Sequence, residues 1–345
     1  MHLVDGADAH GIIQNGNTLL HILVEVKDHP IVPLLHRLIA KGADIDARSR
    51  WGNTPLHIAA KDAPVVACAL INLGASLTIR DGLGRTPLHL AAEHGNLEVL
   101  HLILARKGAD VHVIDNYKRT LLHLLCGCLS TSRKDGNYAM ELLLENGVDV
   151  DARDLNGETC LHYAAKSAAI TLIFQLLRLG ANANVVDKEG RNPMHALAES
   201  CRPDPWENLR ICAESLVAHG AVIEGRDNQL RTPLHYATCR DISVARYLIE
   251  QGADVFARDS SGGMALDNVA GCGWPDVQPL IDEAAARDPQ FLARALLYTA
   301  RGGSVEIARY LIGRGADARG DRELSWAPIC LASFHGHLDM VRLLI

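Results

Sequence analysis

The chain has 345 residues, with 34 Lys plus Arg against 41 Asp plus Glu, so its formal net charge is −7 at pH 7 with histidine neutral. This mild acidity supplies no global positive field for nucleic acid or for an anionic membrane surface, and we expect neither as a partner. Apolar residues make up 48% and charged residues 22%, which is typical of a folded chain. No run approaches about 18 apolar residues, so no transmembrane segment is predicted, and residues 1–10 lack the pattern of a signal peptide.

The cysteines indicate the compartment. There are 9 of them, and most lie inside apolar stretches of helical period. An odd number in a long chain predicts reduced, buried thiols and a cytoplasmic location, with the nucleus as the alternative, rather than a disulfide framework. Cys126 and Cys128 are one residue too close for the usual spacer of a zinc site, and no second pair lies nearby. We therefore expect neither a metal nor another cofactor.

A four-residue motif recurs along the chain. Its copies begin at residues 18, 54, 86, 120, 159, 192 and 232, so they are separated by 32 to 40 residues. They are Thr18-Leu19-Leu20-His21, Thr54-Pro55-Leu56-His57, Thr86-Pro87-Leu88-His89, Thr120-Leu121-Leu122-His123, Thr159-Cys160-Leu161-His162, Asn192-Pro193-Met194-His195 and Thr232-Pro233-Leu234-His235. Seven of the 17 histidines therefore occupy one repeated position.

A second motif, Gly-Ala-Asp or a close variant, follows each copy and occurs once more near the end. Its glycines are Gly42, Gly74, Gly108, Gly147, Gly180, Gly220, Gly252 and Gly315. Between the two motifs lie two apolar patterns of helical period, which in the third repeat predict helices over 88–94 and 97–105. Thr at the start of the tetrad is a natural N-cap, Pro favours the first helical position, and the closing glycine favours a left-handed cap.

The tetrad, the two helical patterns, the glycine between them and the closing motif together resemble the ankyrin repeat family, whose period is about 33 residues, over essentially the whole chain. The resemblance implies an all-α solenoid of helix-turn-helix units with β-turn fingers. We divide it into a stack over residues 1–288, with a partial first repeat and about eight repeats of which the last is degenerate, and continuing repeats over 289–345, the last incomplete. One repeat cannot bury its own apolar face, whereas a stack of them can.

The tetrad histidines are predicted to be structural. The resemblance implies that each ring bonds backbone groups in the loops, which suits an imidazole with one donor and one acceptor. Each belongs to a different repeat, and neighbouring helices lie about 10 Å apart. That separation is too large for shared metal coordination at about 2 Å.

Two insertions stretch the turn between the paired helices. One covers residues 128–137 and the other residues 200–208, in the fourth and sixth repeats. A cleft for a small ligand between these loops is one hypothesis, with Arg133, Lys134, Arg202 and Trp206 as its wall. The alternative is that both loops are spacers, because solenoids tolerate insertions at this edge.

The pattern also changes in the eighth repeat and at both ends. Asp267 stands where the tetrad histidine is expected, and helical runs over 291–300 and 304–312 follow Asp288-Pro289, so we expect a finger to be missing there. The sequence near Gly6 resembles the close of an earlier repeat, and the last residues stop inside a second helix. Solenoids normally end in polar caps, so we expect the chain to be part of a longer array.

The finger tips are the predicted contact surface, because the family usually binds partners there and on the first helices. Trp51, Leu83 and Tyr117 are expected at the tips of three successive repeats, and exposed aromatic side chains are enriched in binding hot spots. The other predicted contact residues are Asn156, Arg85, Arg119, Arg191 and Arg231. The arginines either attract an acidic partner or pair with the aspartates of their own fingers, and we favour the pairing.

The sequence predicts a binding protein and no enzyme. It contains no phosphate loop, no Gly-x-Ser-x-Gly elbow and no His-Glu-x-x-His motif. We expect a monomeric scaffold or adaptor that binds a protein partner on its concave finger and inner-helix face. The alternatives are a targeting or regulatory part of a larger protein (a ubiquitin-ligase adaptor, channel subunit or effector) or the small-ligand site between the loops.

Overall fold

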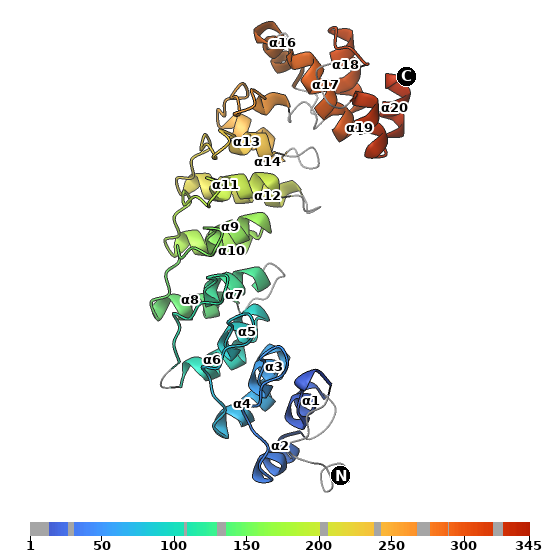
Figure 1. Cartoon of the computed structure of the whole chain (residues 1–345). Coiled ribbons are helices and arrows are strands. Elements are labelled where there is room, and N and C mark those ends of the chain that lie inside the picture. The colour runs from blue at the N-terminus through green and yellow to red at the C-terminus, as the bar shows by residue number, and fades with distance from the viewer. Residues whose placement is uncertain are drawn as a thin grey trace. The chain divides into compact units, whose positions relative to one another are not determined.

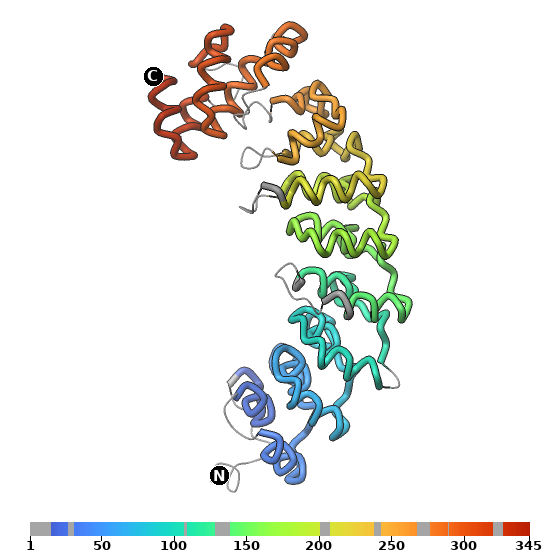
Figure 2. The backbone as a smooth tube through the Cα atoms, turned by 180° about the vertical axis from the view of Figure 1, so that it is seen from behind, coloured from blue at the N-terminus to red at the C-terminus, as the bar shows by residue number. Residues whose placement is uncertain are grey.

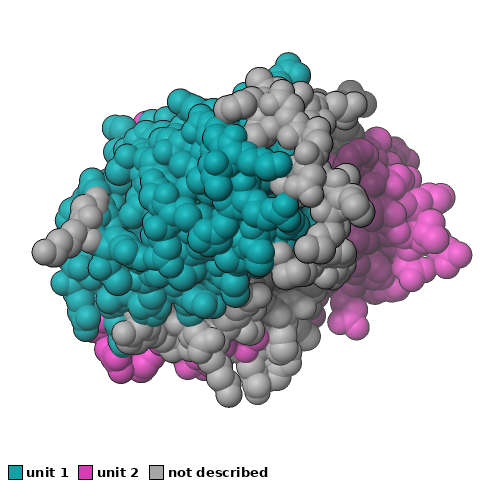
Figure 3. Space-filling model, turned by 90° about the horizontal axis from the view of Figure 1, so that it is seen from below, with its two compact units in different colours: residues 1–160 teal, residues 161–345 magenta. Residues whose placement is uncertain are grey.

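The computed structural model of the chain describes residues 14–26, 31–106, 109–129, 136–200, 206–237, 243–267, 277–288, 290–319 and 327–345. The chain divides into two compact units, residues 1–160 and 161–345 (Figure 3). Across the described ranges, no helix combines the length and the apolar character needed to cross a membrane.

Unit 1 is a stack of helix pairs (Figure 1). Its elements are η1 (Gln14–Gly16), α1 (Leu19–Glu25), α2 (Ile31–Ala40), α3 (Pro55–Asp62), α4 (Pro64–Asn72), α5 (Pro87–Glu93), α6 (Leu97–Leu104), α7 (Leu121–Leu129) and α8 (Gly136–Glu145). The first helices α1, α3, α5 and α7 pack on one another in turn, and the second helices α2, α4, α6 and α8 form a parallel series. Each apolar face is thereby covered by the neighbouring repeat.

Unit 2 repeats the same arrangement, as Figure 2 shows from behind. Its helices are α9 (Cys160–Lys166), α10 (Ile170–Arg178), α11 (Pro193–Glu199), α12 (Trp206–Ala218), α13 (Pro233–Tyr236), α14 (Ser243–Glu250), α16 (Gln278–Arg287), α17 (Phe291–Gly302), α18 (Val305–Gly313), α19 (Pro328–Phe334) and α20 (Leu338–Leu344). Helix α11 packs on α13 and α10 on α12, while α17 packs on α19 and α18 on α20. In the described residues the β-structure is limited to isolated bridges, so the fold is all-α, as predicted.

The first helices begin as the tetrad predicts. Thr54 is the N-cap of α3 with an extended backbone, its side chain accepts from the His57 N–H, and Pro55 takes the first helical position. Asn192 performs the same role for α11. The helices predicted over 88–94 and 97–105 are α5 and α6, which agree at their ends to within one residue.

The core lies where successive first helices meet. The tetrad leucines are fully buried or nearly so, as at Leu56 and Leu88, and the alanine pair Ala59-Ala60 has no exposed surface. Small alanine side chains let the neighbouring backbones approach closely. The closing glycines within the described residues adopt the predicted left-handed conformation, with a φ of 94° at Gly42, so the chain can leave these second helices without strain.

One finger is missing in unit 2, as the degenerate repeat predicts. Helix α16 ends at Arg287 and α17 begins at Phe291, so residues 288–290 alone connect them. The helical runs predicted over 291–300 and 304–312 are α17 and α18. The division of the chain at residue 288 stays a prediction.

Candidate functional site

Each finger ends in a five-residue turn, whose positions we number one to five. Position one is an aspartate in most fingers and position three lies at the tip. The turns are Ser49–Asn53, Asp81–Arg85, Asp115–Arg119 and Asp154–Glu158 in unit 1, and Asp187–Arg191, Asp227–Arg231 and Asp259–Gly263 in unit 2.

The aspartate at position one holds its turn together. Oδ1 of Asp81 accepts the N–H groups of Leu83 and Arg85, both at 2.9 Å, and Oδ2 accepts from Nε of Arg85 at 2.9 Å. Burial alone would raise the pKa of Asp81, but the N–H groups and the guanidinium outweigh it, so this pKa lies below its usual value. The Asp81 carboxylate therefore stabilises its own turn.

Position four requires a left-handed backbone. Glycine occupies it in most fingers, and at Gly84 a Cβ would lie 2.2 Å from Oδ1 and 3.0 Å from the backbone nitrogen of Asn116. Lys118 and Leu230 are the exceptions, with φ of 58° and 59°. These two residues carry backbone strain that glycine would avoid.

Backbone hydrogen bonds join successive tips in unit 1. The carbonyl of Trp51 accepts the N–H of Gly82 at 2.8 Å, and the carbonyl of Leu83 accepts the N–H of Asn116 at 3.0 Å. The carbonyl of Tyr117 accepts the N–H of Leu155 at 2.7 Å. The three position-three side chains therefore stand on fingers that are fixed in register.

These tip side chains are exposed, as the sequence predicts. Trp51 is 67% exposed, Leu83 40% and Tyr117 48%, although nothing in the turns requires apolar side chains there. Two of them lie beside cations: the Arg50 guanidinium is 5.9 Å from the Trp51 ring centroid, and that of Arg119 is 5.2 Å from the Tyr117 ring. Asn156 continues the series with an exposed amide.

The arginines at position five pair with the aspartates of their own fingers, which is the alternative that we favour from the sequence. The pairs are Arg85 with Asp81, Arg119 with Asp115, Arg191 with Asp187, and Arg231 with Asp227. The arginine side chains are only 15% to 30% exposed. They brace the turns, and any contact with a partner is made by the part that remains accessible.

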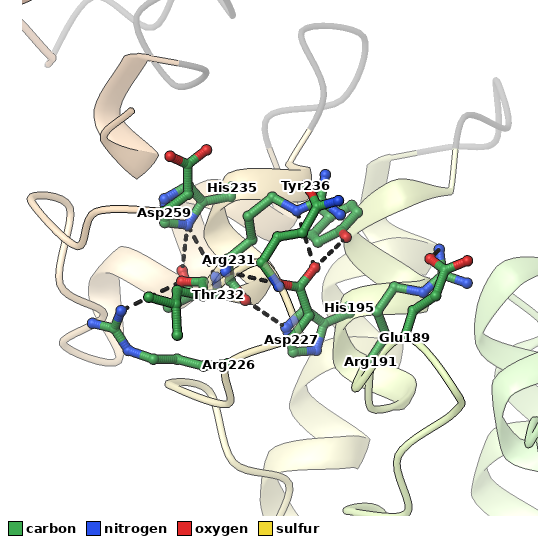
Figure 4. Close-up of polar contacts among 12 residues, drawn as sticks. Glu189, Arg191, His195, Arg226, Asp227, Arg231, Thr232, His235, Tyr236 and Asp259 are labelled. Carbon is green, nitrogen blue, oxygen red and sulfur yellow. Dashed lines mark hydrogen bonds and ion pairs between the residues drawn. The ribbon is translucent and has the colours of Figure 1, made fainter. Parts of the chain in front are cut away.

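Tyr236 adds a further brace in unit 2 (Figure 4). Its hydroxyl donates to Oδ2 of Asp227 at 2.6 Å, and the Arg231 guanidinium lies 4.5 Å from its ring centroid. Burial and this carboxylate raise the pKa of Tyr236 well above its usual value. Arg191 reaches the carboxylates of both Glu189 and Glu199 at 3.3 Å. The tips of unit 2 therefore carry mainly polar side chains, and these make most of their hydrogen bonds and ion pairs within the chain.

The tetrad histidines tie each first helix to the next finger. In His57, Nδ1 accepts the N–H of Thr54 at 3.1 Å and Nε2 donates to the carbonyl of Arg85 at 3.0 Å. Equivalent Nε2 bonds run from His21 to Asn53, His123 to Glu158, His162 to Arg191 and His195 to Arg231. His89 differs, because its buried Nε2 has no partner in the described structure.

Burial also controls the charge of these rings. It lowers the pKa of His57 and His123, and the carbonyl that each ring bonds offsets only part of this effect. For His89, which lacks that bond, burial lowers the pKa to about 4. The rings are therefore neutral at pH 7 and act as structural cross-links, as predicted.

Asp267 replaces the histidine of the degenerate repeat. Its Oδ2 accepts the N–H of Met264 at 2.9 Å, as Nδ1 of a tetrad histidine would, and Nε of Arg294 at 3.1 Å. Arg294 also bonds Oδ2 of Asp288 at 2.7 Å. A buried ion pair thus substitutes for the histidine bridge where the finger is missing.

The loop-cleft hypothesis falls on residues beyond those described. Arg133, Lys134 and Arg202 lie outside the described residues, and although Trp206 begins α12, its side chain is outside them too. Where the structure can be examined, no three His, Cys, Asp or Glu side chains are grouped to hold a metal ion. Cys126, Cys160 and Cys212 are buried free thiols as predicted, whereas Cys330 is exposed.

Two features escaped the sequence reasoning. Lys118 carries an exposed charge and directly follows Tyr117 in the chain. The sequence pattern marks it as unusual, because position four is glycine in most of the other fingers. The Tyr236–Asp227 bond joins residues nine positions apart, and no repeated pattern marks it because the other repeats mostly lack this tyrosine.

Stacked helix pairs with hydrogen-bonded fingers define a repeat solenoid whose fingers carry the exposed chemistry. The sequence family described as "Ankyrin repeats (3 copies)" matches overlapping segments between residues 20 and 259, and the chain belongs to the ankyrin repeat family. A mouse protein named "B-cell lymphoma 3 protein homolog" is 29% identical over 245 residues, covering 67% of this chain and 52% of the mouse protein. Human "Ankyrin repeat and SOCS box protein 16" is 32% identical over 205 residues, covering 59% of this chain and 39% of that protein.

A solved structure shares the architecture. The crystal structure of the ankyrin repeat domain of Bcl-3 is 28% identical, with a TM-score of 0.52, and the match covers 68% of this chain and all of that one. The chain spans about half the length of the mouse relative and less of the human one.

Proposed function

We propose that this chain is a protein-interaction module, a scaffold or adaptor that grips a protein partner with its fingers and inner helices. The observation that carries the proposal is the set of exposed tip side chains Trp51, Leu83 and Tyr117, on fingers joined by backbone hydrogen bonds. Large rigid side chains that are ordered before binding lose little entropy in a complex, and Trp and Tyr are enriched in hot spots.

The remaining tip residues would supply polar contacts. Asn156 offers an exposed amide, while Arg85 and Arg119 present the accessible edges of guanidiniums already paired with aspartate. Arg191 and Arg231 do the same in unit 2. Fixed side chains favour specificity, because they accept only partners that match their geometry. We propose no catalytic role, since each aspartate at position one accepts hydrogen bonds from backbone N–H groups of its own turn.

Relatives of this chain are longer proteins. The chain spans only a fraction of its relatives, one of which is named for a SOCS box in addition to its ankyrin repeats. A targeting or regulatory role within such a protein is the second candidate. We place the chain in the cytoplasm or the nucleus, because buried free thiols such as Cys126 and Cys160 suit a reducing compartment.

Site-specific cross-linking tests the proposal. The photoreactive residue p-benzoylphenylalanine replaces Tyr117 at the tip in unit 1 or, as the matched control, Gln229 at the same finger position in unit 2. Irradiation in cells of the source organism should give a covalent adduct with one defined protein from position 117. No adduct from position 117, or the same adducts from both positions, contradicts binding at the unit 1 tips.

A further inference from the structure

The unit 1 tips combine apolar side chains with two cations that lack a carboxylate. Arg50 is exposed and its guanidinium lies 5.9 Å from the Trp51 ring centroid. Lys118 is exposed and directly follows Tyr117 in the chain. Neither cation forms an ion pair with the residues that the structure describes, in contrast to the arginines at position five. The charge of both side chains is therefore available to a partner.

The nearby aspartates cannot neutralise these cations. Asp81 and Asp115 are 6% and 4% exposed, and in each the Oδ1 atom accepts two backbone N–H groups while Oδ2 holds an arginine. The first turn has Ser49 in place of the aspartate, so the five-residue turn that contains Arg50 holds no carboxylate. The strip is locally cationic on a chain whose net charge is −7.

The equivalent tips of unit 2 have different chemistry. Position three is Glu189, Gln229 and Ser261, and the Glu189 carboxylate is 65% exposed. Lys188 occupies the position that Arg50 holds in unit 1, but the tip beside it is acidic rather than aromatic. The apolar and cationic combination is thus specific to unit 1 among the described fingers.

We infer that the unit 1 tip strip, defined as Arg50, Trp51, Leu83, Tyr117 and Lys118, binds a protein segment in which Asp or Glu residues flank exposed apolar side chains. The inference rests on the proposed function and names its partner chemistry. Apolar groups of the segment cover the three tips, and its carboxylates approach the two free cations. Charge complementarity of this kind speeds association and excludes basic segments.

Selection of short random peptides tests the inference. A phage-displayed library is panned on the full chain, and clones that also bind the Trp51→Ala/Leu83→Ala/Tyr117→Ala variant are removed. The enriched peptides are synthesised, and their affinities are measured for the unmodified chain, for Arg50→Glu/Lys118→Glu and for Lys188→Glu. Circular dichroism and urea unfolding verify that each variant is folded.

The enriched peptides should carry Asp or Glu beside aromatic or aliphatic residues. Reversing the two unit 1 charges should weaken their binding by about tenfold or more, while Lys188→Glu changes it by less than about twofold. Tip-dependent peptides that tolerate the unit 1 charge reversal, or that are basic, overturn the inference and leave the proposed function standing. Failure to recover any tip-dependent peptide also overturns it, whereas the cross-linking at position 117 judges the proposed function separately.

A fluorescent oligothymidylate provides the remaining comparison, because aromatic and cationic strips also suit single-stranded nucleic acid. No binding is expected at physiological salt. Binding that requires both the tips and the two cations overturns the inference in favour of a nucleic-acid ligand.

Discussion

Nε2 of His57 donates a hydrogen bond to the carbonyl oxygen of Arg85 at 3.0 Å and so joins a first helix to the next finger. The same atom of His89, one repeat later, is buried and has no hydrogen-bond partner among the described residues. The two rings are both fully buried and cap their helices in the same way, through Nδ1. Comparison of the two residues therefore measures how much the hydrogen bond from Nε2 to the next finger contributes to stability.

We expect His57→Asn to destabilise the chain more than His89→Asn. Asparagine is able to replace Nδ1 as the acceptor of the cap but is too short to reach the next finger. Since the Arg85 carbonyl keeps a second donor, the N–H of Asp81, the extra loss should be about 1 kcal/mol. Urea unfolding of both variants measures the difference, and equal losses would show that the bridge does not contribute to stability.

Stability should fall in mild acid because the buried histidines resist protonation. Burial lowers the pKa of His89 from 6.5 to about 4, so between these values the unfolded chain binds more protons than the folded chain. Unfolding is then favoured as the pH falls, and this ring alone should cost about 2 kcal/mol between pH 7 and pH 5. His57 and His123 shift in the same direction and add to the effect.

The check is the free energy of unfolding at both pH values. His89→Asn should reduce the pH dependence of the free energy of unfolding. An undiminished dependence in His89→Asn would contradict the account of this ring.

Leu230→Gly should stabilise the protein. Leu230 has a φ of 59° at finger position four, and its side chain is 48% exposed, so relief of strain outweighs the lost apolar contact. We expect a gain of about 0.5–1 kcal/mol after the added flexibility of the unfolded chain is subtracted. The reverse change at the same position, Gly190→Ala, should destabilise, because a Cβ there lies 2.9 Å from the Asn228 nitrogen. The explanation would be refuted if thermal unfolding showed that both substitutions shift the melting temperature in the same direction.

Asp267→Asn should weaken unit 2 strongly. Asp267 is 1% exposed and its carboxylate pairs with Arg294, so its replacement leaves the half-buried guanidinium with Asp288 alone. The loss should approach about 3 kcal/mol. The matched control is Asp282→Asn, whose exposed pair with Arg314 should be worth less than about 1 kcal/mol. A similar small effect for both substitutions in urea unfolding would rule out the bridging role of Asp267.

Sequence periodicity predicts most of the fold, because the physical requirements of one repeat recur in every repeat. The Thr54 cap, the buried Leu56 and the Arg85–Asp81 pair all follow from residue type and position in the motif. Exposure of Trp51 and Tyr117 is predictable for the same reason, since a turn tip has no core to cover it.

Features that occur once escape this reasoning. The orphaned Nε2 of His89 depends on the placement of the next finger, which its motif does not encode. The bond from Tyr236 to Asp227 likewise depends on three-dimensional proximity that no spacing rule specifies. The sequence shows that Asp267 replaces the tetrad histidine. Its ion pair with Arg294, however, depends on how α17 packs.

The most direct test of the central claim is quantitative affinity capture from lysate of the source organism. The unmodified chain is compared with Trp51→Ala/Tyr117→Ala and with the control Lys188→Ala/Gln229→Ala, which changes tip residues of unit 2. We predict one defined protein whose recovery falls by about tenfold or more with the first variant and persists with the second. Equal recovery with all three chains would contradict binding through the unit 1 tips.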